Sequence, residues 1–337
     1  MDTYTIAVVG ASGLVGRKML QVLEERDFPV KDLRLLTSAR SAGIELTFRG
    51  KSYRTEEVSA RAFADVDIAL FSAGSDASRQ WAPVAVNAGA VVIDNSSAYR
   101  MTDGVPLIVP EVNSGDLPDA GPRIIANPNC STIQMVVALK PLHDRYGLHR
   151  VVVTTYQSVS GAGKRGVDQL QAELDGGVAE NPAFPHPIVE NAIPHIAAFN
   201  ESGFTVEEEK MINETRKILG DAQLNVSPTC VRIPVRSSHS EALHIEMRSS
   251  FELEDVRSML SAFPGITVID NPARMEYPLA RNAAEKDDVF VGRLRRDPSV
   301  EHGLIMWVVS DSLRKGAATN AVQIAELWLS LLPSTGK

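Results

Sequence analysis

Short apolar runs alternate with segments of helical spacing through the first half of the chain. Runs rich in β-branched residues predict strands in TIAVVG (5–10), DLRLLTS (32–38), DIALFSAG (67–74) and AVVIDNS (90–96). Apolar residues at helical spacing predict helices in GLVGRKMLQVLEER (13–26) and SDASRQWAPVAVNAG (75–89). This alternation is typical of a parallel sheet with helices on both faces. We therefore expect an α/β domain at the N-terminus.

The second half has a different pattern, in which longer runs alternate apolar with polar residues. It predicts strands in VVVTTYQSV (151–159), CVRIPV (230–235), SEALHIEMRS (240–249) and LIMWVVS (304–310). Such alternation favours an antiparallel sheet with one solvated face, and hence an α+β domain. Residues 207–219 have helical periodicity, whereas the Pro-rich residues 180–200 predict an extended loop that covers a partner surface.

The last segment, KGAATNAVQIAELWLSLL (315–332), has the periodicity of a long helix. We expect this helix to return to the first domain. The predicted domains are then residues 1–129 plus 314–337, and residues 130–313. A chain of 337 residues is long enough for two domains.

Composition narrows the class of protein. The net charge of −8 argues against a surface built for nucleic acid or anionic lipid. The N-terminus has no signal-peptide pattern, and no apolar run reaches membrane-spanning length. Only two cysteines are present, Cys130 and Cys230, which is too few for a disulfide framework. These features predict a cytoplasmic protein with reduced thiols.

A glycine-rich turn, GASGLVG (10–16), joins the first predicted strand to the first predicted helix. Glycines let backbone N–H groups at a helix N-terminus approach a phosphate closely, so the turn predicts a dinucleotide site of the Rossmann type. The spacing G-x-x-G-x-x-G departs from the usual G-x-G-x-x-G, and the alternative is a tight turn that binds nothing.

The end of the second predicted strand bears on which dinucleotide is bound. Sites that prefer NAD usually have an acidic residue here for the ribose hydroxyls. This chain has Ser38 and Arg40 in TSARSAG and no acid. A hydroxyl and a guanidinium suit a 2′-phosphate, which predicts NADP. The alternative is that Arg40 is a solvated loop residue.

The segment NPNCST (127–132) places a cysteine where a helix is predicted to begin. Asn127 precedes a proline and is disfavoured in helical geometry. Asn129 is a good N-cap, so Cys130 falls in the first helical turn, where a thiolate is favoured. We interpret Cys130 as a nucleophile, with a buried small residue as the alternative. Cys230, within a predicted strand, fits that structural role.

A thiolate nucleophile needs a partner for proton transfer, which is usually a histidine. Among the seven histidines, His239 lies in a polar turn between two predicted strands, close in sequence to Arg232 and Arg236. His244 lies in the following strand and suits a structural role. No histidine pair has the spacing of metal ligands and no C-x-x-C is present, so we predict no metal.

Taken together, these segments resemble the aspartate-β-semialdehyde dehydrogenase family, with spacing closer to its Gram-positive-like subgroup. The resemblance runs nearly the whole length, in order, through GASGLVG, FSAG (71–74), VPEVN (109–113), NPNCST, QSVSGAG (157–163), EEEKM (207–211), RIPVRSSHSE (232–241) and RKGAATNAVQIAE (314–326). It implies a Rossmann-type NADP-binding domain, a C-terminal α+β catalytic and dimerisation domain, and a homodimer or homotetramer.

The resemblance also implies a reaction. L-Aspartyl-4-phosphate and NADPH give L-aspartate-4-semialdehyde, NADP⁺ and phosphate, a step that feeds lysine, threonine, methionine and diaminopimelate biosynthesis. Cys130 would be the nucleophile and His239 the general acid/base. A thiol suits the hydride step, because a thioester accepts hydride far more readily than an oxygen ester does.

The remaining site residues follow from the same resemblance. Gln157 would orient the thioacyl intermediate, Arg232 would bind the α-carboxylate and Glu207 the α-ammonium. The phosphate site would use Arg100, Asn129 and Lys210. The cofactor contacts would be Gly10, Ser12, Gly13, Leu14, Val15, Ser38, Arg40, Ser160, Gly161 and Asn320.

Each of these residues has a simpler interpretation when it is taken alone. Glu207 and Lys210, three apart on one helix, could form a surface ion pair. Arg100 could be an exposed residue at a strand end, and Gln157 a residue of the polar face of a strand.

Rival functions also remain open from the sequence. N-acetyl-γ-glutamyl-phosphate reductases and glyceraldehyde-3-phosphate dehydrogenases share the two-domain plan and the Cys–His pair. A nucleotide-binding regulator would need no reactive thiol, and a cysteine hydrolase would need no glycine turn.

Overall fold

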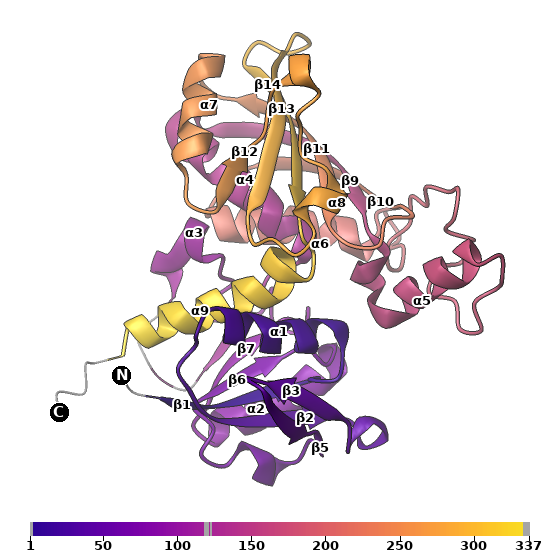
Figure 1. Cartoon of the computed structure of the whole chain (residues 1–337). Coiled ribbons are helices and arrows are strands. Elements are labelled where there is room, and N and C mark those ends of the chain that lie inside the picture. The colour runs from indigo at the N-terminus through magenta and orange to yellow at the C-terminus, as the bar shows by residue number, and fades with distance from the viewer. Residues whose placement is uncertain (1–2, 118–120, 122, 333–337) are drawn as a thin grey trace. The chain divides into compact units, whose positions relative to one another are not determined.

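The computed structural model describes residues 3–117, 121 and 123–332. The chain forms two compact units (Figure 1). The first contains Met1–Pro128 and Ala317–Lys337, and the second contains Asn129–Gly316.

The first unit is built on a parallel six-stranded sheet. Its strand order is β5-β2-β1-β6-β7-β8. The strands are β1 (Tyr4–Val9), β2 (Val30–Thr37), β5 (Glu56–Glu57), β6 (Ile68–Phe71), β7 (Val91–Asp94) and β8 (Ile124–Ala126). A small hairpin, β3 (Glu45–Phe48) and β4 (Lys51–Arg54), lies apart from this sheet.

Helices cover both faces of the sheet (Figure 1). The helices and 3₁₀ turns of this unit are α1 (Leu14–Glu25), α2 (Ser75–Asn87), α3 (Pro110–Asn113), α9 (Thr319–Ser330), η1 (Ala39–Ser41), η2 (Ala60–Phe63) and η3 (Ser114–Asp116). Successive strand residues point to opposite faces, so Ile6 packs with α1 and α9 while Ala7 packs with α2. The expected doubly wound domain, with the last helix returned to it, is confirmed.

The second unit contains a six-stranded mixed sheet with the order β10-β9-β11-β14-β13-β12. The strands are β9 (Leu148–Gln157), β10 (Asn225–Arg232), β11 (His239–Met247), β12 (Ile266–Val268), β13 (Val289–Asp297) and β14 (Gly303–Ser310). The expectation of a purely antiparallel sheet was wrong, because β9 pairs with β10, and β12 with β13, in parallel. A long connection carrying two helices separates β9 from β10, which is what a parallel return requires.

The helices and short helical turns of the unit are α4 (Cys130–Tyr146), α5 (Gly163–Leu174), α6 (Val206–Leu219), α7 (Leu253–Ala262), α8 (Ala280–Ala283), η4 (Val159–Ala162), η5 (Pro272–Arg274) and the π-helical turn η6 (Arg314–Ala318). Helices α4, α6 and α7 lie on one face of this mixed sheet, and the short α8 packs with Phe290 and Val309 on the other face. Helix α4 packs on β9, β11 and β14, and α6 packs on β10. Val151, Val153 and Thr155 of β9 are buried on this face, whereas the alternate residues Thr154 and Tyr156 are only partly buried.

Some elements agree with the sequence patterns and others do not. Helix α6 agrees with the predicted 207–219, and the Pro-rich segment 180–200 contains no helix or extended strand. The last predicted helix begins later than expected, because residues Arg314–Ala318 form a π-helical turn before α9. Within the described part of the chain, no helix combines the length and the apolar character needed to cross a membrane.

Candidate active site

The register of the mixed sheet places three candidate residues in one row. Arg232 of β10 pairs with Gln157 of β9. Ser240 pairs with Tyr156, so His239 at the start of β11 lies level with Gln157. The side chains of Arg232, Gln157 and His239 are all buried, on the face that α4 covers. Two strand ends and one strand start therefore meet in a single polar row.

Cys130 is brought to this row by the start of α4. Asn129 is the N-cap, and its Oδ1 accepts a hydrogen bond from the Ser131 N–H at 2.9 Å. The N–H of Asn129 donates to Glu214 Oε2 of α6 at 2.7 Å. The expected helix start is present, and the cap is fixed to a second helix. Cys130 is partly exposed, whereas Cys230 is fully buried.

The thiol of Cys130 lies next to the imidazole of His239. Cys130 Sγ is 3.2 Å from His239 Nε2, so the pairing expected from the sequence is present. The backbone N–H of Ser158 donates to His239 Nδ1 at 3.0 Å. A backbone N–H can only donate, so this hydrogen bond assigns Nδ1 as the unprotonated nitrogen of the neutral ring. The ring proton is then on Nε2, facing the sulfur.

Burial decides the charge of this imidazole. Removal from water, followed in size by the charge of the Arg232 guanidinium, lowers the pKa of His239 to about 3. The ring is therefore neutral near pH 7. The pKa of His239 is lower in the folded chain than in the unfolded one. As the pH falls below the ordinary value of 6.5, the unfolded chain therefore takes up the proton first, and the free energy of unfolding decreases.

Glu207 is the central charged group of the site. Glu207 is 6% exposed, so its i,i+3 ion pair with Lys210 is present but does not lie on the surface. Glu207 Oε1 accepts from Gln157 Nε2 at 3.2 Å, and Oε2 accepts from Lys210 Nζ at 3.2 Å. Burial alone would raise the pKa of Glu207, but Lys210, Asn129 and Arg232 outweigh it and lower the pKa to about 2. Glu207 is thus an ionised carboxylate at neutral pH.

Arg232 and Gly161 occupy the other side of His239. Arg232 Nη1 donates to the carbonyl oxygen of Ser158. A Cβ on Gly161 would lie 2.8 Å from Arg232 Nη1 and 3.4 Å from His239 Nε2. Gly161 was expected beside the cofactor, and the structure places it against the catalytic row. Any side chain at this position would displace the guanidinium.

A chain of buried hydroxyl groups continues from the histidine. Ser158 Oγ is 3.2 Å from His239 Nδ1 and 2.9 Å from Ser160 Oγ. Ser160 Oγ is in turn 3.0 Å from Ser312 Oγ. Ser160, which was expected to contact cofactor, therefore also belongs to the surroundings of His239.

Several residues of the site escaped the sequence analysis. Ser158 lies in the QSVSGAG segment but was assigned no role, and Ser312 lies in none of the quoted segments. Glu214 did leave a signal, because it lies two helical turns after Glu207 and so on the same face of α6. Gly316, in the π-helical turn, packs so closely against Cys130 that a Cβ there would lie 2.9 Å from Cys130 Cβ.

The glycine turn of the first unit has the shape expected of a dinucleotide cradle. Gly10 has a φ of 87°, and a Cβ on it would lie 2.3 Å from the carbonyl oxygen of Ser72 at the end of β6. A Cβ on Gly16 would lie 2.3 Å from the Gly10 oxygen. The turn lies between the carboxyl ends of β1 and β6, where the strand order reverses and α/β sheets bind ligands.

The neighbours of this turn are consistent with a nucleotide site. Gly13 is the N-cap residue of α1, so no side chain caps the first N–H groups of this helix. Leu14 and Val15 are the first two helical residues. Ser12 Oγ lies 3.1 Å from Thr37 Oγ1, which ties the turn to the end of β2. Ser38 and Arg40 follow β2 and are both exposed, so a solvated Arg40 stays an alternative.

Two further candidates belong to the first unit and are buried. Arg100 donates through Nε to the Asn127 oxygen and through Nη2 to the Asn95 oxygen, both at 2.9 Å. It is therefore no exposed strand-end residue. Asn320 Nδ2 donates to Asn127 Oδ1 at 2.6 Å and to the Ile108 oxygen at 3.0 Å.

The candidates thus fall into two groups. The second unit brings together the row of Arg232, Gln157 and His239 with Asn129, Cys130, Ser160, Gly161, Glu207 and Lys210. The first unit holds Arg100, Asn320 and the glycine cradle. Over the ranges 3–117, 121 and 123–332, no group of three or more His, Cys, Asp or Glu side chains is arranged to hold a metal ion.

Comparison with known proteins gives the same picture over the whole chain. Residues 5–120 match the family described as semialdehyde dehydrogenase, NAD binding domain, and residues 139–315 match semialdehyde dehydrogenase, dimerisation domain. The aspartate-semialdehyde dehydrogenase of Aquifex aeolicus is 54% identical over 331 residues, which cover 96% of this chain and 97% of the relative. That of Bacillus subtilis is 50% identical over 333 residues, which cover 95% and 96%.

Solved structures agree with the sequence relatives. Aspartate semialdehyde dehydrogenase II of Vibrio cholerae, complexed with ASA, has a TM-score of 0.93 and 48% identity and covers 98% of this chain and 99% of its own. The Candida albicans enzyme with NADP has a TM-score of 0.78 and 25% identity, with 98% and 99% covered.

The two cysteines should differ sharply in reactivity. We expect iodoacetamide to label Cys130 in the folded protein and to leave Cys230 untouched, because Cys230 is buried and its thiol pKa is raised by burial and by nearby acids, Glu207 first. Peptide mass spectrometry before and after unfolding measures this. Fast labelling of Cys230 in the folded chain, or none of Cys130, would contradict the assignment.

Proposed function

The chain belongs to the aspartate-semialdehyde dehydrogenase family, and from this premise we propose that it reduces L-aspartyl-4-phosphate with NADPH through a thioester on Cys130. The observation that carries the proposal is the 3.2 Å contact between Cys130 Sγ and His239 Nε2. The ring is held by the Ser158 amide, and an ionised carboxylate and a guanidinium lie in the same site. The product is L-aspartate-4-semialdehyde, an intermediate in lysine, threonine, methionine and diaminopimelate synthesis.

The thiolate of Cys130 attacks the acyl phosphate carbonyl, forms the C–S bond and expels inorganic phosphate. Within the second unit, Lys210 and Asn129 are the groups assigned to the phosphate. The glycine cradle would hold the nicotinamide cofactor, which would supply the hydride that reduces the thioester. When charged, His239 gives its Nε2 proton to the resulting oxyanion. It takes the proton back as the C–S bond of the hemithioacetal breaks, which releases the aldehyde and restores the thiolate.

Ser158 can serve both protonation states of His239. Its N–H donates to an unprotonated Nδ1, and its hydroxyl oxygen, 3.2 Å from the same atom, can accept a proton from Nδ1 when the ring is charged. The neutral ring already carries its proton on Nε2, so charging the ring adds a proton at Nδ1, where the Ser158 hydroxyl oxygen can accept a hydrogen bond from it. Gln157, fixed by Glu207, is assigned to orient the thioacyl group.

Recognition of the amino acid uses opposite charges at the two ends of one site. Arg232 suits the α-carboxylate, because a guanidinium can bind a carboxylate through two parallel hydrogen bonds. Glu207 is ionised and suits the α-ammonium. An N-acetylated substrate has no ammonium to offset this buried charge, which disfavours the acetylglutamyl-phosphate rival.

The test runs the reaction in the oxidative direction. We expect NADP⁺ reduction that requires both L-aspartate-4-semialdehyde and phosphate, that falls at least a thousandfold in Cys130→Ala, and that is absent with N-acetyl-L-glutamate semialdehyde. NADPH absorbance measures the rate. Activity with the acetylated aldehyde alone would transfer the assignment to the rival, and full activity in Cys130→Ala would remove Cys130 as the nucleophile.

The nicotinamide cofactor is assigned as NADP through Ser38 and Arg40. Both are exposed at the end of β2, and no hydrogen bond or ion pair involves the Arg40 side chain within the described residues. The glycine cradle has no room for side chains at Gly10 and Gly16, which fits the close approach of a pyrophosphate. A reaction that draws on this cofactor and on amino-acid intermediates suits the cytoplasm, where we place the protein.

Removing the guanidinium should change the cofactor preference selectively. We expect Arg40→Ala to raise the KM for NADP⁺ about tenfold, the loss of one charge-assisted contact to a phosphate, and to leave the KM for NAD⁺ unchanged. Steady-state kinetics with each cofactor measures the ratio. Equal changes for both cofactors would show that Arg40 does not contact the 2′-phosphate.

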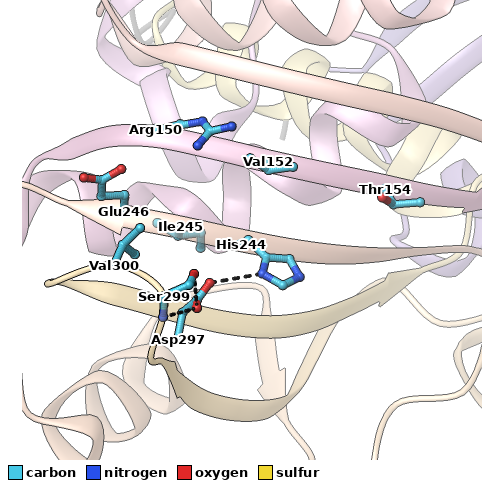
Figure 2. A pocket seen from close by; sticks show the side chains of 9 residues that line it. All are labelled: Arg150, Val152, Thr154, His244, Ile245, Glu246, Asp297, Ser299 and Val300. Atoms are coloured by element: carbon cyan, nitrogen blue, oxygen red, sulfur yellow. Dashed lines mark hydrogen bonds and ion pairs between the residues drawn. The ribbon is translucent and has the colours of Figure 1, made fainter.

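The protein is assigned as a homodimer or a homotetramer, in line with its match to a dimerisation domain. The open face of the mixed sheet, opposite α4, carries partly buried side chains such as Tyr156, whose ring lies 5.4 Å from that of Trp307. A hollow of about 290 Å³ lies on this face. Figure 2 shows the side chains that line it: Arg150, Val152, Thr154, His244, Ile245, Glu246, Asp297, Ser299 and Val300. We propose a second copy of the chain as the occupant of the open face.

A charge on this face should separate the subunits. We expect Tyr156→Glu to lower the molar mass in solution toward the monomer, because it buries an unpaired charge in the interface. Analytical ultracentrifugation measures the mass. Leu174→Glu, at an exposed position on α5, is the matched control and should keep the wild-type mass. An unchanged mass in Tyr156→Glu would place the interface elsewhere.

A further inference from the structure

Arg232 lies where the Pro-rich segment joins the mixed sheet. Ile193 of this segment forms an isolated antiparallel bridge with Arg232. The Ile193 N–H donates to the Arg232 oxygen at 2.9 Å, and the Arg232 N–H donates to the Ile193 oxygen at 2.8 Å. The segment is therefore attached to the backbone of the residue that is assigned to the substrate carboxylate.

Two side chains of α5 hold the rest of the segment in place. Gln169 Oε1 accepts from the N–H groups of Ala183 and Phe184, at 2.7 and 3.0 Å. Glu173 Oε2 accepts from the N–H groups of Ile188 and Val189, at 2.7 and 2.9 Å. These bonds satisfy four backbone donors of a segment that has no regular structure.

An apolar cluster adds to this attachment. It contains Val159, Leu170, Ile188 and Ile193, with Phe184 packed against it. A Cβ on Gly166 would lie 3.2 Å from the ring of Phe184, so the ring also meets the backbone of α5 closely. Phe184 therefore has a defined position despite lying in a loop.

The ring of Phe184 packs against the guanidinium of Arg232. Arg232 Cζ lies 5.6 Å from the centre of the Phe184 ring, and both residues line a hollow of about 340 Å³. Gly161 touches Nη1, which also donates to the Ser158 oxygen. Arg232 Nε is buried and has no hydrogen-bond partner within the described residues. The guanidinium is thus confined, with a donor left for a ligand.

We propose that Phe184 is a positioning residue that holds the Arg232 guanidinium for the α-carboxylate of the amino-acid substrate. The inference rests on the proposed function, because it assigns to Phe184 a part in binding that substrate. The ring face attracts the buried cation and limits its rotamers. Phe184 should stabilise the bound substrate and the transition state equally, because the α-carboxylate takes no part in the chemistry.

The test separates binding of the carboxylate from all other steps. We expect Phe184→Leu to raise the KM for L-aspartate-4-semialdehyde between about two- and thirtyfold, the range that a cation–π contact allows, with kcat unchanged. The KM values for phosphate and NADP⁺ should stay at their wild-type levels. Phe184→Tyr keeps the ring face and should restore wild-type KM.

A matched control uses the same change elsewhere. Phe204 is partly exposed, and its ring contacts no other ring or cation among the described residues, so Phe204→Leu should leave all constants unchanged. An unchanged KM in Phe184→Leu, or equal losses in Leu and Tyr variants, would overturn the inference. A wild type without phosphate-dependent activity would instead overturn the proposed function.

Discussion

The hydrogen bond from the Ser158 amide to His239 Nδ1 is the interaction on which the site depends. It assigns the proton of a fully buried imidazole to the nitrogen that faces Cys130. Two neighbouring strands determine the geometry of this hydrogen bond, because Ser158 directly follows the end of β9 and His239 is the first residue of β11. The sheet register, rather than side-chain packing alone, therefore determines how His239 is presented to Cys130.

Charge balance is the second requirement of such a dry site. Buried Glu207 would be protonated in isolation, and it stays ionised because Lys210, Asn129 and Arg232 surround it. The same Arg232 lowers the pKa of His239 and keeps the ring neutral. One guanidinium thus stabilises a carboxylate and prevents a second positive charge next to itself. Burial raises the pKa of the Glu241 carboxyl, two residues after His239, well above its ordinary value.

Much of this arrangement was predictable from the sequence, and the reasons differ by residue. Cys130 could be identified because an N-cap and a helix start are local features of the sequence. The central strands could be predicted because the alternation of apolar and polar residues is also local. The parallel pairing of β9 with β10 was missed, since it depends on a crossover of many residues. Ser158, Ser312 and Gly316 were missed because each acts through a contact distant in sequence, which no single motif reports. Phe184 could not be identified from the sequence, because it lies in a loop whose conformation is fixed by Gln169 and Glu173 of α5.

The most direct test of the account is to trap the acyl group on the enzyme. The protein is mixed with L-aspartate-4-semialdehyde and NADP⁺ without phosphate, quenched in acid and examined by intact and peptide mass spectrometry. The account predicts one NADPH and one aspartyl thioester on Cys130 for each active site, with the thioester lost when phosphate is added before quenching. NADPH formation with no adduct on Cys130, or an adduct on Cys230, would contradict it.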